Sequence, residues 1–304
     1  MKRWLVATAG YLAYTLAILV FLLWWRFPAP EVAAWCEARL HARYPALSWK
    51  IGSLQWEFPD RMRLSHIQAR AGQVKMMEID SLHLTLDLTS LFRKKRRITY
   101  EMQLFGGTGT GRISLASGHD LVCQGRFSDL KLDRMQGLAL RLNRAVRGGL
   151  GATFSWQGSW PELNTKELSG MVRIDKGLLP LRKPVLGLKE LDFSRLEAGV
   201  SYQDQAWMVD KGVLEAKTMH VSFTGKVVPG PNLGLYHLHF SGKLTPRAEL
   251  FRTVGSRELA MVIRGFLSNG ALPLKVTGTA AEPAVELPGG LSAALRRLHA
   301  RGGG

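Results

Sequence analysis

The chain lacks the motifs that would assign it to a familiar enzyme class. It contains no H-E-x-x-H metalloprotease motif, no G-x-S-x-G nucleophile elbow and no C-x-x-C pair. The glycine-rich run 107–111 lies between two expected strands instead of opening a helix, which argues against a dinucleotide site. Gly225-Lys226 and Gly242-Lys243 lack the other residues of a phosphate loop. We therefore expect a protein that is not an enzyme and that needs no cofactor.

Metal ligands and cysteines are also scarce. His237 and His239 share one face of an expected strand, but no third ligand accompanies them, so we expect no metal site. The only two cysteines are Cys36 and Cys123. They could form a disulfide outside the cytoplasm, or each could pack as a small apolar side chain. Their places in an expected helix and an expected strand favour the second interpretation.

Acidic residues are few, because 24 Asp and Glu stand against 41 Lys and Arg, which leaves a formal net charge of +17. This excess implies an acidic partner, such as anionic lipid, lipopolysaccharide, acidic protein or nucleic acid. No nucleic-acid-binding motif is present, so we expect lipid or protein and not nucleic acid. The sharpest basic cluster is Arg93, Lys94, Lys95, Arg96 and Arg97. It predicts a contact to acidic lipid or protein, and the alternative is a solvated hairpin tip.

Charge is absent from one long stretch, Trp4–Trp25. A helix of about 22 residues at ~1.5 Å per residue is about 33 Å long, enough to cross a hydrocarbon core of ~30 Å. Trp4, Trp24 and Trp25 stand at its two ends, where indole rings favour the headgroup layer. We expect residues 1–27 to form a transmembrane signal-anchor. The alternative is a cleaved signal peptide, but its apolar core would be shorter.

The anchor also predicts an orientation and a packing surface. Lys2 and Arg3 favour a cytoplasmic N-terminus, and long domains that follow an anchor are translocated largely regardless of charge. Ala9, Ala13 and Ala17 recur every four residues and form a smooth ridge. Small residues let transmembrane helices approach closely, so the ridge predicts helix packing, with lipid-facing filler as the alternative.

Beyond the anchor we expect a helical neck over 28–45, a β-rich domain over 46–287 and a basic flexible tail over 288–304. In the β-rich region apolar residues recur with a period of two, which is typical of antiparallel strands with one apolar and one polar face. Two neighbouring strands show this best. Their apolar faces carry Leu82, Leu84, Leu86 and Leu88, then Ile98, Tyr100, Met102 and Leu104.

Besides the neck, helices are expected only over 138–147, 182–191 and 246–267, too few to cover one face of a large sheet. A sheet with one apolar face must cover that face with something. We therefore predict a mainly β fold, in which an elongated antiparallel sheet curves into a half-barrel with an apolar concave face, partly closed by the 246–267 helices. The alternative is a two-sheet sandwich with a filled core. Ser/Thr-Gly pairs at 169–170, 224–225, 241–242 and 277–278 are expected to mark bulges or bends.

Several segments together resemble a known family. They are Phe27-Pro28 after the anchor, the segments 49–54 and 62–67, the alternating segment 79–91, the glycine-rich segment 104–111 and the end 274–283. The combination resembles the type II secretion system protein N family (GspN), which is similar to the wider AsmA-like group of inner-membrane-anchored periplasmic proteins. The resemblance implies an elongated curved sheet with a hydrophobic interior, and it supplies no catalytic residues.

The resemblance also implies a location and a function. The chain would cross the inner membrane once, with its bulk in the periplasm. We expect a non-enzymatic accessory component of type II secretion, whose partners are inner-membrane lipid and other secretion components. One alternative is an AsmA-like lipid-binding or lipid-transfer protein with a lipid ligand in the apolar groove. A second alternative is a general envelope scaffold.

The anchor prediction can be tested with reporter fusions to the full chain. A fusion after Gly290 should be active as alkaline phosphatase, which needs the periplasm, and silent as a cytoplasmic reporter. The reverse pattern, or a mature N-terminus near Trp35, would contradict it.

Overall fold

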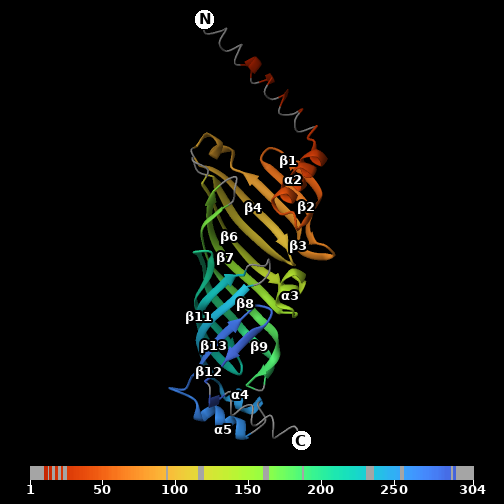
Figure 1. Ribbon diagram of the computed structural model, residues 1–304. Helices are drawn as coiled ribbons and strands as arrows, with labels where there is room; N and C mark the ends of the chain where they lie inside the picture. The colour runs from red at the N-terminus through yellow and green to blue at the C-terminus, as the bar shows by residue number, and fades with distance from the viewer. Residues whose placement is uncertain are drawn as a thin grey trace.

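A single antiparallel sheet of 14 strands forms most of the protein in this computed structural model (Figure 1). The structure describes residues 10–12, 14, 15, 18, 19, 22, 26–93, 95–115, 120–159, 164–186, 188–230, 236–253, 257–288, 290 and 291. Each strand pairs with its neighbours in the chain, so the spatial order of the strands is also their sequence order. The prediction of a mainly β fold with one large antiparallel sheet and few helices is confirmed.

The strands are β1 (Ser48–Glu57), β2 (Arg61–Ala71), β3 (Val74–Leu86), β4 (Arg96–Leu104), β5 (Gly107–Leu115), β6 (Asp120–Lys131), β7 (Arg147–Ser159), β8 (Asn164–Val185), β9 (Leu188–Gln203), β10 (Ala206–Ala216), β11 (Met219–Pro229), β12 (Tyr236–Pro246), β13 (Leu272–Gly278) and β14 (Pro283–Glu286). The helices are α2 (Ala29–Arg43), α3 (Gln136–Leu142), α4 (Ala248–Thr253) and α5 (Arg257–Gly265), with 3-10 helices η1 (Leu88–Phe92) and η2 (Leu132–Arg134).

Little of the predicted anchor lies among the described residues. Residues 10–12, 14, 15, 18, 19 and 22 are helical with exposed side chains. The end residues Trp4, Trp24 and Trp25 and the ridge Ala9, Ala13 and Ala17 lie outside the described residues. Within the part of the chain that the structure describes, no helix is both long and apolar enough to cross a membrane. The anchor and the location that it implies stay predictions.

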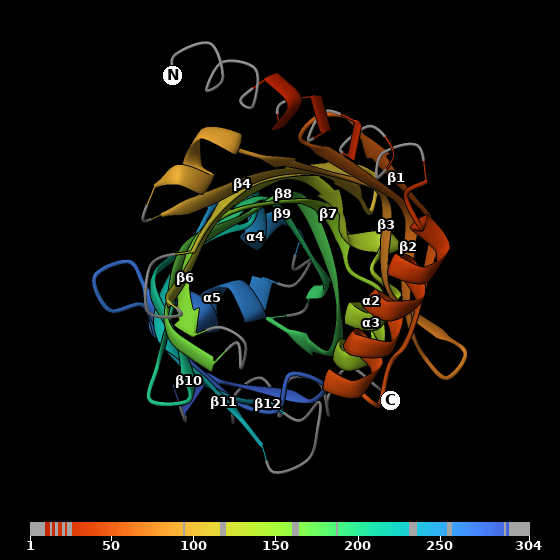
Figure 2. The same cartoon turned by 90° about the horizontal axis from the view of Figure 1, so that it is seen from above.

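Period-two alternation makes one face of the sheet apolar and the other polar. On the apolar face, Leu82 lies opposite Met102, Leu84 opposite Tyr100, and Leu86 opposite Ile98. The sheet curls so that this face is concave, which Figure 2 shows end-on, with α4 and α5 seen inside the curve. We call this concave apolar face the trough. It matches the predicted curved sheet, and the two-sheet sandwich is wrong because all the strands belong to one continuous sheet.

Two local predictions are wrong. Leu88 does not continue the alternation of β3, because the Asp87 carboxylate accepts hydrogen bonds from Ser90 N (3.2 Å) and Thr89 Oγ1 (2.7 Å) and caps η1. Such local bonds compete with a strand ladder, and Leu88 is 41% exposed. The segment 182–191 is not a helix but the tight connection between β8 and β9, where Val185 pairs with Leu188.

Glycines on the trough make room for aromatic rings. Tyr100 on β4 pairs with Gly111 on β5, which pairs with Gly125 on β6. A Cβ on either glycine would overlap the Tyr100 phenol, so the ring lies where two side chains are missing. Phe240 lies over Gly225 in the same way, with its ring 2.6 Å from an ideal Cβ position.

The Ser/Thr-Gly pairs therefore have a different role from the expected one. Gly170, Gly225 and Gly242 pair across their strands without a change of register, so they are not bulges. Two of the changes of register fall beside Lys176 and Lys211, which both have a left-handed φ of 51° inside strands β8 and β10. These positions are bulges, which let a strand bend.

Two filled cores lie at opposite ends of the trough. At the upper end in Figure 1, α2 packs Val32, Ala33 and Cys36 against buried residues of β1 and β2. At the lower end, α4 and α5 place Leu250 and Ile263 against β12 and β13. Leu291 is fully buried in this lower core.

The helical neck also protects one edge of the sheet. α2 fits the predicted neck, with a proline in its first turn and the acidic Glu31 beside it. Its Glu37 Oε1 accepts a hydrogen bond from Ile51 N of the edge strand β1 at 2.6 Å. An unpaired strand edge invites aggregation, and this contact occupies one of its donors.

The glycines that make room for the Tyr100 ring predict a specific effect on stability. A Cβ at Gly111 would overlap both the Tyr100 phenol and the backbone oxygen of Gln124, and the backbone of a paired strand cannot easily move away. Gly111→Ala should therefore destabilise the protein by about 1–3 kcal/mol. Gly149→Ala is the matched control, because nothing lies within 4 Å of its Cβ position. Thermal unfolding of the full-length protein followed by circular dichroism compares the two, and equal melting temperatures would contradict this account.

Candidate functional site

An apolar pocket of about 400 Å³ opens at the upper end of the trough. We call it the upper pocket. Its floor is formed by Met62 of β2, Leu84 and Leu86 of β3 and Ile98 of β4. Its remaining lining residues are Phe27, Trp56, Pro59, Asp60 and Arg61. The lining is almost entirely carbon, so the pocket suits an apolar ligand with few polar groups.

The predicted groove residues divide between the upper pocket and the packed sheet below it. Leu84, Leu86 and Ile98 line the pocket. Leu82 and Met102 pack against the upper core, and Leu104 and Tyr100 are buried lower on the same face. Leu88 lies outside the trough. The two strands that carry the predicted groove residues thus form part of the pocket wall.

Two aromatic residues of the pocket were not predicted. Phe27 is the last residue of the predicted anchor, and Trp56 lies next to the end of β1; their rings meet edge to face with centroids 5.4 Å apart. The apolar period of β1 could have pointed to Trp56. No local pattern connects Phe27 with strands β3 and β4, because that contact joins segments far apart in the sequence.

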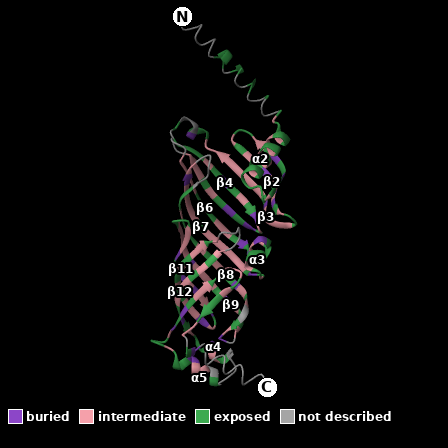
Figure 3. Ribbon diagram, viewed as in Figure 1, coloured by how far each residue is buried: buried purple, intermediate pink, exposed green. Residues whose placement is uncertain are grey.

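Between the two filled cores, the trough stays half-buried. Phe154 and Trp156 of β7, Tyr202 of β9 and Trp207 of β10 all have intermediate exposure. Figure 3 shows this intermediate class along much of the sheet. Phe127 and Phe154 stack with centroids 5.5 Å apart. An apolar face in this state is neither a packed core nor an ordinary polar surface.

The trough also holds a thiol and a phenol that stay neutral. Cys123 Sγ lies 4.0 Å from Tyr100 Oη and donates a weak hydrogen bond to it. Burial raises the pKa of the Tyr100 phenol well above its usual range, and the neighbouring Cys123 adds to this. Burial also raises the pKa of the Cys123 thiol. Since the thiolate is the reactive form of cysteine, this thiol is a poor nucleophile. Cys36 and Cys123 are both free, so the packing interpretation of the cysteines agrees with the structure.

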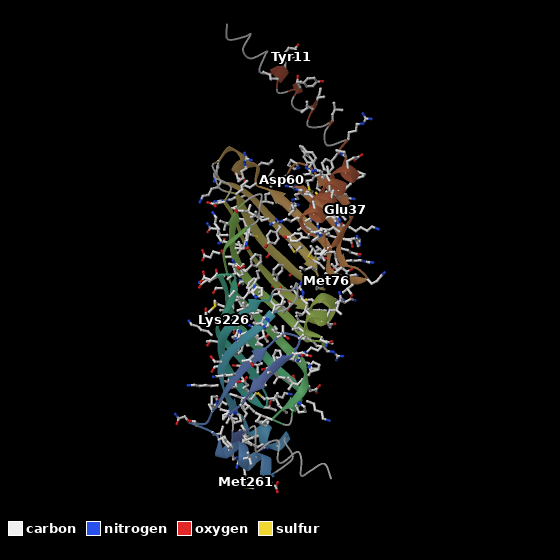
Figure 4. The ribbon with its side chains drawn as sticks, in the orientation of Figure 1. Tyr11, Glu37, Asp60, Met76, Lys226 and Met261 are labelled. Atoms are coloured by element: carbon white, nitrogen blue, oxygen red, sulfur yellow. The ribbon has the colours of Figure 1, made fainter. Side chains whose placement is uncertain are left out.

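The predicted basic cluster lies beside the upper pocket. Arg93, Lys95, Arg96 and Arg97 follow η1 and are all exposed, while Lys94 lies outside the described residues. Asp87, which caps η1, stays negative: the hydrogen bond from Thr89 lowers the pKa of its carboxyl group most, and Arg93 contributes more weakly. Figure 4 places Asp60 of the pocket at the same end of the molecule as Tyr11, with Met261 at the opposite end. The basic cluster and the pocket therefore share the end from which the predicted anchor extends.

The open side of the trough is bridged halfway along by α3 (Figures 1 and 2). Gly137 of α3 packs on Met76 of β3. Beyond the helix, Arg144 Nη2 donates to the backbone oxygen of Ala281 at 3.0 Å, and Nη1 donates to that of Pro180 at 3.4 Å. Arg144 thereby ties α3 to the turn before β14 and to β8. We call this contact the seam.

A second hollow of about 390 Å³ lies over β6 to β9, where Gly149 and Gly151 leave space. Its Arg173 already forms an ion pair with Asp175 at 2.7 Å, so its charges are partly satisfied within the chain. Among the described residues no group of three potential metal ligands gathers, and His237 and His239 are both exposed. The upper pocket and trough are therefore the strongest candidate site.

Comparisons with known proteins find no counterpart: no family model, no curated protein and no solved structure matches the chain. The resemblance to the secretion protein N family consequently rests on the sequence segments named above.

The seam predicts a local effect of one side chain. Arg144→Ala removes both hydrogen bonds to the backbone oxygens of Pro180 and Ala281. Amides of α3 should then exchange with deuterium several-fold faster, and the free energy of unfolding should fall by about 1–3 kcal/mol. Arg147→Ala, an exposed arginine three residues later, is the control and should change neither quantity. Unchanged exchange in Arg144→Ala would show that other contacts hold α3.

Proposed function

We propose that this chain is a non-enzymatic lipid-binding protein of the cell envelope, anchored in the inner membrane, whose trough holds acyl chains. The observation that carries the proposal is the apolar upper pocket, which continues into a half-buried apolar face. Water covers such a surface only at a free-energy cost of about 25 cal/mol per Å². A flexible hydrocarbon chain fits a long trough of this kind, because it needs no polar partner along its length.

The position of the pocket supports a membrane source for this ligand. Phe27 is the last residue of the predicted anchor, and it forms part of the pocket wall. The mouth of the trough therefore lies within a few residues of the bilayer that the anchor would occupy. A lipid that leaves the bilayer would meet the upper pocket first. Because the sheet is elongated, the trough extends away from that membrane (Figure 1).

An accessory role in type II secretion is the second candidate. It is favoured by the combination of sequence segments that resembles the protein N family, and by an elongated sheet of the kind that the resemblance implies. In this case the trough would serve a component of the secretion apparatus. Genes for secretion components beside this one would favour that role, whereas lipid-metabolism genes would favour lipid handling.

A charge introduced into the pocket tests the lipid proposal. Leu86→Asp should cost little stability, because the site opens to ligand and solvent, but it should abolish copurification of lipid detected by mass spectrometry. Leu274→Asp is the control in the filled lower core, where an unpaired buried charge should cost several kcal/mol. Both variants are made in the full chain and compared by thermal melting. Loss of cooperative folding in Leu86→Asp, or wild-type protein free of lipid, would count against the proposal.

A further inference from the structure

The rim of the upper pocket carries cations that the protein leaves unpaired. Arg61, the first residue of β2, is exposed and is among the pocket-lining residues, and it pairs in register with Thr85 on the polar face of β3. Arg96 stands two residues before Ile98 on β4, so period two puts both on the trough face of that strand, about 7 Å apart. Arg96 is also exposed, and it pairs in register with Leu115 of the next strand.

Carboxylates are present at this end, but they do not neutralise these two arginines. Asp60 lies in the pocket lining, and Glu57 is opposite Arg61 in register. The Asp87 carboxylate accepts hydrogen bonds at the start of η1. Among the described residues, neither Arg61 nor Arg96 forms an ion pair or a hydrogen bond through its side chain. Elsewhere on the sheet some cations have ion-pair partners, as Arg195 does with Glu197 and Lys166 with Asp120, and others, such as Arg112 and Arg126, have none among the described residues. What sets Arg61 and Arg96 apart is therefore their position where the apolar pocket opens.

An apolar pocket with a basic rim matches one ligand chemistry. We propose that the upper pocket takes an acyl chain of a lipid with a net anionic headgroup, and that Arg61 and Arg96 bind this headgroup at the rim. The proposal rests on the lipid-binding function above and names the class of lipid. Guanidinium groups bind phosphate oxygens through paired hydrogen bonds, and an exposed rim lets the headgroup keep much of its hydration.

The test compares two lipids that differ in net headgroup charge but share their acyl chains. Tail-labelled fluorescent phosphatidylglycerol and phosphatidylcholine are titrated into the full-length protein in a neutral detergent, so that no charged membrane surface is present. Wild-type protein should prefer phosphatidylglycerol, and 0.5 M salt should weaken this preference. Arg61→Gln combined with Arg96→Gln should reduce the preference by about fivefold or more while leaving phosphatidylcholine binding unchanged.

Matched controls separate the headgroup site from general charge. Arg112→Gln combined with Arg126→Gln removes two exposed arginines from the polar face of β5 and β6, and should keep the wild-type preference. Leu86→Trp fills the pocket and should abolish binding of both lipids, with circular dichroism confirming the fold.

Each other outcome counts against the inference. An equal affinity of wild-type protein for the two lipids, or a preference that survives in the Arg61/Arg96 variant, would overturn the headgroup site and leave the lipid-binding function standing. A preference for phosphatidylglycerol that persists in Leu86→Trp would show that the cations act without the pocket, and would overturn it as well. Failure of wild-type protein to bind either lipid would overturn the proposed function together with this inference.

Discussion

The whole structure depends on one constraint: a sheet that is apolar on one face must keep that face from water. Strand after strand presents the same apolar side, and the chain provides only short helices to cover it. The curl of the sheet turns the apolar side inward, and α2 with α4 and α5 fill its two ends. Between these ends the trough is covered by the curvature of the sheet and, halfway along, by α3, and this partial cover leaves a site for an apolar ligand.

Curvature in turn depends on where side chains are missing. Tyr100, Phe240 and similar rings occupy more space than a tightly curled face offers, and glycines on the neighbouring strands supply that space. Bulges at Lys176 in β8, the longest strand, and at Lys211 in β10 add local bends. The polar face needs no such devices, since its side chains splay outward into water. The glycines beside Tyr100 and Phe240 thus serve the curvature of the sheet and do not mark loops.

The strand pattern was readable from the sequence because period two is a local property. The alternation around Leu84 and Leu86 sufficed to predict both the sheet and the wall of the upper pocket. The alternation gave a wrong prediction at Leu88. There the hydrogen bonds of the Asp87 side chain end the strand, although Leu88 still fits the apolar alternation of the sequence. Contacts between distant segments could not be predicted, because the alternation describes only neighbouring residues. Nothing near Phe27 or Arg144 in the sequence indicates the partners that they find in the fold.

The strand order has a consequence for how the protein is made. Every strand pairs with the one before it, so each pairing closes only a short loop and needs no later part of the chain. A chain that emerges N-terminus first can add hairpins one at a time to an existing edge. β1 acquires its cover from α2, which is synthesised before it. The lower core must wait for α4, α5 and Leu291, and a chain stopped before β14 would end in an open strand edge.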